Sequence, residues 1–203
     1  EQDYLTALRR DFHAHPEISL HEYRTAEHIE AELDKLGIAH ERCGKTGVYA
    51  VLHGAKPGSG VLVLRADTDA LAITETHETE YKSQNEGVMH ACGHDSHIAC
   101  LLGAAKLLSG EKGNFGGEVR FFFQPAEEIG AGAKEFIAAG HLEGAQRVFG
   151  LHAASDIPAG SIGVKAGSNN AAVDYFKIVV KGYAAHVSTP QKGVDALYIA
   201  SQI

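Results

Sequence analysis

The chain has 203 residues, a formal net charge of −8 and no run of Lys or Arg residues. The length suffices for one sizeable core and part of another domain, and the acidic balance argues against nucleic acid and anionic membranes as partners. No apolar stretch is long enough to span a bilayer, and three cysteines are too few for a disulfide framework, which favours a reducing, cytoplasmic setting.

Two helices are predicted at the start of the chain. Residues 4–12 place apolar side chains at helical spacing. Ser19 and Glu22 match a capping box in front of a second amphipathic segment, which runs to Leu36 and is closed by Gly37. Both segments are expected to bury one apolar face.

Short apolar runs follow, each bounded by polar or glycine-rich residues. We predict buried strands at 48–52, 61–64, 119–123 and 148–151, with a turn at 56–60. Helical patterns lie between them at 98–108 and 134–139. This alternation predicts an α/β fold with a largely parallel sheet and helices on both faces.

The pattern changes near residues 167–170. Residues 173–180 alternate like a half-exposed strand, and a helix is predicted from Val194 onward. We therefore assign residues 1–168 to a first domain and residues 169–203 to the truncated start of a second one.

A stretch rich in potential metal ligands lies between the predicted strands. Residues 89–97 contain three histidines, one cysteine and one aspartate, and they run directly into a helical pattern. Cys92 and His94 are separated by one glycine, so a thiolate and an imidazole can turn toward one point. A helix N-terminus favours anions and lowers the pKa of a thiol. The sequence therefore indicates a transition-metal site.

Three of the predicted strands also end in ligand-type side chains. Because open α/β sheets bind ligands beyond the carboxyl ends of their strands, four distant segments would deliver these groups to one edge. The groups are Asp67 and Asp69, Glu127 and Glu128, His152, and the pair Cys92 and His94.

Two mechanisms fit parts of this set. In metal-assisted hydrolysis, one of two adjacent carboxylates binds the metal while the other takes a proton from water, and Glu127 and Glu128 suit these roles. Alternatively, Cys92 would be a nucleophile with His90 or His94 as its base. The second mechanism explains neither the glutamate pair nor the histidine after the last strand, so we favour the first.

Several of these residue types also have structural interpretations. Asp67 and Asp69 are equally well explained as turn formers after a strand. Cys100 is predicted to lie in the core. The sequence His13-Ala14-His15 is interpreted as structural, because a proline follows it and no buried strand precedes it.

Together these motifs resemble the M20 metallopeptidase family, specifically its amidohydrolase branch, which includes hippurate hydrolases, auxin-conjugate hydrolases and N-acyl amino acid deacylases. The order of the Cys-Gly-His-Asp and Pro-Ala-Glu-Glu motifs is specific, and the cysteine marks the amidohydrolase branch. The resemblance covers essentially the whole chain and rests on residues 10–17, 65–71, 90–95, 124–128, 150–152, 182–186 and Pro190.

The resemblance implies a role for each site residue. Glu127 would be the general base and later the acid, Asp69 would orient a metal ligand, and His186 would polarise the scissile carbonyl from the partner subunit. One or two divalent metal ions (Zn, Mn, Co or Ni) would be held by Cys92, His94, Glu128 and His152, with Cys92 as a candidate bridge.

The resemblance further implies hydrolysis of the amide bond of N-acyl amino acids or related small amides. Residues 1–168 would form a zinc-peptidase-like catalytic domain, and residues 169–203 would begin an α+β, ferredoxin-like lid domain through which the full-length protein forms a homodimer. The family's last metal-binding histidine lies farther downstream, so we expect an N-terminal fragment. Two alternatives stay open: a dipeptidase or aminopeptidase of the same family, and a non-catalytic metal-binding homologue, against which an intact Glu127 argues.

Overall fold

The computed structural model describes all of residues 1–203, which form two compact units, Glu1–Asp156 and Ile157–Ile203. The assignment of residues 1–168 and 169–203 to two domains stays a prediction. None of the helices has the length and apolar character that crossing a bilayer requires.

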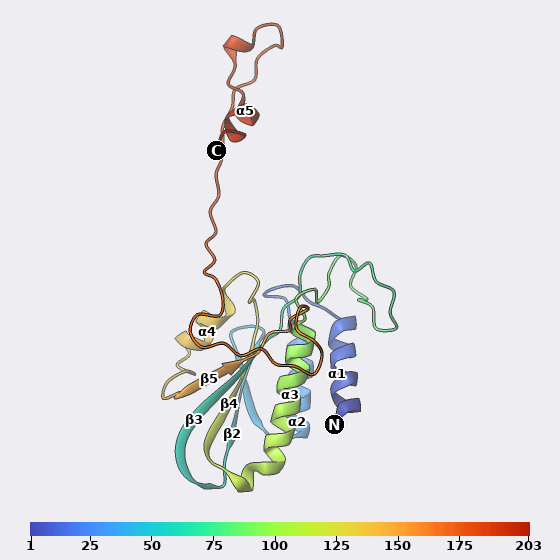
Figure 1. The fold of residues 1–203 in the computed structure, drawn as a ribbon, viewed down its shortest axis with the longest axis vertical. Helices are drawn as coiled ribbons and strands as arrows, with labels where there is room; N and C mark the ends of the chain where they lie inside the picture. The colour runs from blue at the N-terminus through green and yellow to red at the C-terminus, as the bar shows by residue number, and fades with distance from the viewer. The chain divides into compact units, whose positions relative to one another are not determined.

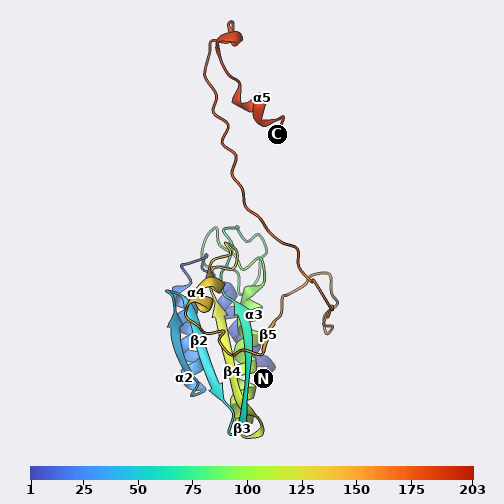
Figure 2. The same ribbon diagram turned by 90° about the vertical axis from the view of Figure 1, so that its left-hand side faces the viewer.

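The first unit is built on a five-stranded sheet with the strand order β1-β2-β4-β3-β5 (Figure 1 and Figure 2). Its strands are β1 (Ala39–Cys43), β2 (Gly47–His53), β3 (Lys56–Asp67), β4 (Gly116–Gln124) and β5 (Arg147–Gly150). β3 pairs in parallel with β4 and β5, whereas β2 pairs antiparallel with β1 and β4. The predicted α/β class is confirmed, but the sheet is mixed rather than largely parallel, because the short connection at 44–46 can join β1 and β2 only as an antiparallel pair.

Helices cover both faces of this sheet, as predicted (Figure 1). One face is covered by α1 (Gln2–Ala14), α2 (Tyr23–Lys35) and α3 (His94–Glu111), which the short η1 (Lys112–Asn114) follows, and the other by α4 (Gly132–Ala138). Alternate side chains of β4 serve two cores: Phe121 and Phe123 pack with α1 to α3, and Phe122 packs with Phe136 of α4. A strand buried on both faces is apolar throughout, which explains the triple phenylalanine.

The helix α2 lies where the sequence predicts it, but the predicted capping box does not form. Glu22 is the N-cap residue, and it makes no side-chain capping hydrogen bond. The hydroxyl of Ser19 donates instead to the carboxylate of Asp69, with 2.6 Å between the oxygens, because a buried carboxylate requires donors. Gly37 has a φ of 64°, as expected for a glycine that closes a helix.

Three local predictions are corrected by the structure. Residues 56–60 belong to β3, where a register shift between Lys56 and Val61 against β4 absorbs the predicted turn. The sequence does not predict β1, because this edge strand is mostly polar. Cys100 is exposed rather than in the core, since it lines an open apolar hollow between α3 and β5.

The second unit contains little regular structure. It includes η2 (Pro190–Lys192) and α5 (Ala196–Ala200), which confirms the helix predicted from Val194 onward. The strand predicted at 173–180 does not form, because no neighbouring strand in this unit supplies the hydrogen bonds of a ladder. No side chain of residues 157–203 is buried.

Candidate metal centre

The carboxyl ends of β3, β4 and β5 and the first turn of α3 meet at one edge of the sheet in the first unit (Figure 1). Asp67 is the last residue of β3, and Glu127 and Glu128 follow β4 closely. His152 follows β5, and His94 is the first residue of α3. The parallel pairing of the three strands places all of these residues at the same edge.

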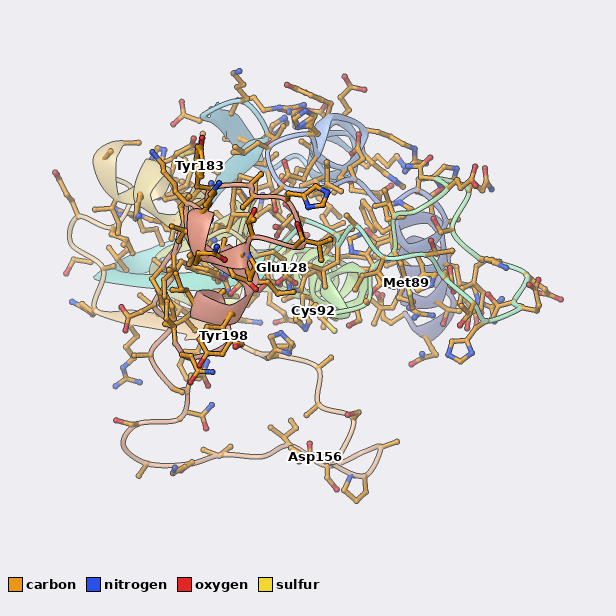
Figure 3. The ribbon with its side chains drawn as sticks, turned by 90° about the horizontal axis from the view of Figure 1, so that it is seen from above. Met89, Cys92, Glu128, Asp156, Tyr183 and Tyr198 are labelled. Carbon is orange, nitrogen blue, oxygen red and sulfur yellow. The ribbon has the colours of Figure 1, made fainter.

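Five predicted site residues meet there in two overlapping groups. The first group is Cys92, His94 and His152, and the second is His94, Glu127 and Glu128. Within each group the potential ligand atoms lie within 4.8 Å of one another. Figure 3 shows Cys92 and Glu128 close together, in agreement with the effect of this carboxylate on the thiol. His94 belongs to both groups and is therefore the centre of the site.

The imidazole of His94 is fully buried and has a defined tautomer. Its Nδ1 lies 2.8 Å from the backbone carbonyl oxygen of Asp69. Because a carbonyl can only accept, Nδ1 carries a proton, so the neutral imidazole presents its lone pair at Nε2. Nε2 has no hydrogen-bond partner and lies 3.8 Å from Oε1 of Glu128, which also has none. Burial opposes protonation of His94, but the hydrogen bond with Asp69 and the nearby carboxylates outweigh it and raise the pKa of the imidazole.

The thiol of Cys92 lies 3.4 Å from Nε2 of His152, measured from Sγ. Burial, together with the negative charges of Glu128 and Glu127, raises the pKa of this thiol to about 12. The prediction that the helix N-terminus lowers the pKa of this thiol is therefore wrong, because burial and the carboxylates have the larger effect. A thiol in this setting is a poor nucleophile by itself, and a bound cation would be needed to stabilise the thiolate.

The carboxylate of Asp69 holds the turn that carries the glutamate pair. Its Oδ1 accepts the backbone N–H of Glu127 at 3.0 Å, and its Oδ2 accepts that of Glu128 at 3.1 Å. Ser19 donates to the same carboxylate, which is 0% exposed. Asp69 therefore fixes the backbone at both glutamates and is more than a turn former.

His97 is a site residue that sequence reasoning missed. Its Nδ1 donates to Oδ1 of Asp67 at 2.5 Å, and its Nε2 accepts the backbone N–H of Ala153 at 2.8 Å. Burial opposes ionisation of Asp67, but the hydrogen bond from His97 and the nearby His94 lower the pKa of this carboxyl to about 2. His97 thus links β3 to the residue after His152. The available signal is its position three residues after His94, which places both rings on one helix face.

His186 lies in the second unit. Its side chain is exposed, and its Nδ1 lies 2.7 Å from the hydroxyl oxygen of Ser188. The catalytic role predicted for His186 stays a prediction.

Comparisons with known proteins find a matching family and similar relatives. Residues 63–201 match the family described as Peptidase family M20/M25/M40. The chain is 46% identical over 206 residues to thermostable carboxypeptidase 2 of Saccharolobus solfataricus, covering 100% of this chain and 52% of that protein. It is 44% identical to an N-acetylcysteine deacetylase of Bacillus subtilis, covering 98% of this chain and 53% of the relative.

A solved structure of the same family is also similar to this chain. The YXEP protein of Bacillus subtilis, described as a dinuclear metal binding peptidase from the M20 family, superimposes with a TM-score of 0.77 at 44% sequence identity. The match covers 79% of this chain and 45% of the other. The chain spans about half the length of the curated relatives it matches.

Proposed function

This chain belongs to the peptidase family M20/M25/M40, and from this premise we propose that it is the metal-binding part of an enzyme that hydrolyses an amide bond in N-acyl amino acids or related small amides. Similarity to an N-acetylcysteine deacetylase supports this substrate class. Similarity to a carboxypeptidase favours a second candidate, hydrolysis of short peptides. Both candidates break a carbon–nitrogen bond by attack of water, and they differ in the substrate pocket.

One observation carries the proposal: the buried Nε2 of His94 and Oε1 of Glu128 face each other at 3.8 Å without hydrogen-bond partners. Unpaired buried polar atoms are costly, and a cation between them would satisfy both. Together with Cys92 and His152 they form a sulfur, nitrogen and oxygen donor set that suits Zn, Mn, Co or Ni. These four residues would hold one or two divalent ions, with Cys92 as a candidate bridge.

When bound, such an ion would lower the pKa of a water molecule and polarise the substrate carbonyl. The carboxylate of Glu127 accepts a proton from the attacking water and then gives it to the leaving nitrogen as the carbon–nitrogen bond breaks. Asp69 holds the amide of Glu127 at 3.0 Å and so fixes the origin of this side chain. It also orients His94 through its backbone carbonyl, and both contacts support its predicted positioning role.

The second unit would contribute to the same reaction in the full-length protein. We assign residues 169–203 to the start of a lid domain through which the protein forms a homodimer. From there His186 of the partner subunit would donate a hydrogen bond to the oxyanion that forms on the scissile carbonyl. Support for this role comes from the sequence motif at 182–186 and from the match of residues 63–201 to the family.

Substrate profiling of the full-length, metal-loaded protein tests the proposed function. N-acetyl amino acids, dipeptides with a free amino group and N-blocked dipeptides are offered at equal concentration, and kcat/KM is measured for each. We expect the N-acetyl amino acids to be the best substrates. A preference of tenfold or more for a peptide, about 1.4 kcal/mol in transition-state binding, would favour the peptidase instead. Hydrolysis of none of them would refute both candidates.

A further inference from the structure

The backbone amides of three consecutive residues, Ala126 and the glutamate pair that follows it, all donate to buried carboxylates. The amide of Ala126 donates to Oε1 of Glu22 at 2.8 Å. The amides of Glu127 and Glu128 donate to the two oxygens of Asp69, at 3.0 and 3.1 Å. Two acidic side chains, Glu22 and Asp69, therefore hold the backbone from which the proposed base and metal ligand project.

The turn needs such support because its conformation is unfavourable. Ala126 has a φ of 53°, in the left-handed region that non-glycine residues rarely adopt. It is 0% exposed, so water cannot replace the acceptor of its N–H group. Strained backbone of this kind persists only where surrounding contacts fix it.

Glu22 is unusual for a residue at the start of a helix. It is the N-cap residue of α2 and fully buried, yet its side chain makes no capping hydrogen bond. Its second carboxylate oxygen accepts the hydroxyl of Thr46 at 2.7 Å. Burial raises the pKa of Glu22, which reflects the cost of placing a carboxyl in the core. Helix capping does not explain a buried glutamate whose carboxylate accepts the backbone N–H of Ala126.

We propose that Glu22 is a positioning residue for hydrolysis: by holding the amide of Ala126 it keeps this turn in its left-handed conformation and so aims Glu127 and Glu128. The inference rests on the proposed function, in which Glu127 transfers the proton and Glu128 binds metal. Without an acceptor for the buried N–H, the turn relaxes toward negative φ. Such a change redirects both following side chains, although Glu22 itself touches neither the substrate nor the metal.

A purely structural role at the N-terminus of α2 is the competing explanation, and Glu17 provides a matched control. The carboxylate of Glu17 accepts the backbone N–H of Arg24 at 3.1 Å and that of Thr25 at 2.8 Å. It therefore supports the helix end at which Glu22 lies, and its side-chain hydrogen bonds go to α2 and not to Ala126. Glu17→Ala should weaken α2 without loosening the turn.

The test uses the full-length protein with Glu22→Ala, Glu22→Met, Glu22→Gln and Glu17→Ala. Hydrogen–deuterium exchange is measured in the metal-free state at the amides of residues 126–128. We expect these amides to exchange roughly tenfold faster in Glu22→Ala and Glu22→Met, which lack an acceptor for the N–H of Ala126. In Glu22→Gln the side-chain carbonyl still accepts from Ala126, so protection should return. Glu17→Ala should exchange faster only in α2.

Steady-state kinetics with loaded enzyme complete the test. We expect Glu22→Ala and Glu22→Met to lose on the order of 10²-fold in kcat with little change in KM, as for displacement of a catalytic group. Glu22→Met fills the buried volume, so it decides the matter if Glu22→Ala does not fold. Unchanged exchange at 126–128 in Glu22→Met, or an equal loss of kcat in Glu17→Ala, would overturn the proposal. A wild-type protein without hydrolase activity would refute the proposed function. Because the exchange measurement needs no substrate, it would still test whether Glu22 holds the turn at 126–128.

Discussion

In the first unit, His94 is fully buried, and its Nδ1 lies 2.8 Å from the carbonyl oxygen of Asp69, which follows β3 and lies 25 residues away in the sequence. In the second unit, His186 is exposed, and its Nδ1 lies 2.7 Å from the hydroxyl of Ser188, two residues away. The first ring is oriented by the folded chain at the cost of desolvation, whereas the second is held only by a sequence neighbour. A motif thus predicts which residue type acts, while burial and long-range hydrogen bonds decide how rigidly it is held.

The contrast between the two units leads to different expectations for variants. Loss of a proposed ligand next to His94 should alter metal binding, because these ligands are held by contacts within the first unit. A change at His186 should leave metal binding intact and act on turnover alone.

The largest effect is expected for the glutamate pair. In full-length Glu127→Gln we expect normal metal content and a kcat lowered by roughly 10²–10⁴-fold, since the proton acceptor is lost. Glu128→Gln should instead lose metal, because its Oε1 faces Nε2 of His94. Metal titration with both variants, followed by turnover measurements, separates the two roles. The reversed pattern would show that the base and the ligand have been assigned the wrong way round.

A smaller loss is expected for the second unit. His186→Ala should keep full metal content and lose roughly 10²–10³-fold in turnover, as for removal of one oxyanion donor. Mixing this inactive variant with inactive Glu127→Gln should restore part of the activity, because one site of a mixed dimer contains both intact residues. After verified subunit exchange, no recovery would contradict the partner-subunit role. Wild-type turnover in His186→Ala would contradict any catalytic role.

The smallest effect is expected for His97, which holds the backbone next to His152. His97→Asn removes the acceptor for the amide of Ala153, so metal affinity should fall by roughly 10–100-fold, as for other residues that orient a ligand. The control is His13→Asn, another buried histidine paired with a carboxylate, Asp95. It should lower stability without this change in affinity. Competitive chelator titration measures the metal affinity of both variants. Equal affinities would show that the link to His152 has no effect on metal binding.

Much of the first unit could be predicted because its patterns are strong. Four apolar runs predicted strands that form, and the residues after three of them meet at one edge because β3, β4 and β5 are parallel. The polar edge strand β1 has no such pattern. The mixed sheet could not be foreseen either, because β4 inserts between β2 and β3, and a strand's own sequence does not specify its neighbours.

The supporting contacts were harder to predict than the ligands. The sequence alone assigns Glu22 to a capping box, since its spacing from Ser19 fits that motif. Its actual partner, Ala126, lies 104 residues away. The strand predicted at 173–180 fails for a related reason, because alternation alone cannot supply a pairing partner.

Cobalt absorption spectroscopy tests the central claim, that Cys92, His94, Glu128 and His152 hold a divalent ion, most directly. Co²⁺ is added to metal-free full-length protein, and the charge-transfer band that a thiolate ligand produces is recorded for wild type, Cys92→Ser and Cys100→Ser. The account predicts the band in wild type and in Cys100→Ser, because Cys100 lies outside the ligand groups, and its loss in Cys92→Ser. A band that survives in Cys92→Ser, or one that never appears in the wild type at saturating Co²⁺, would contradict the account.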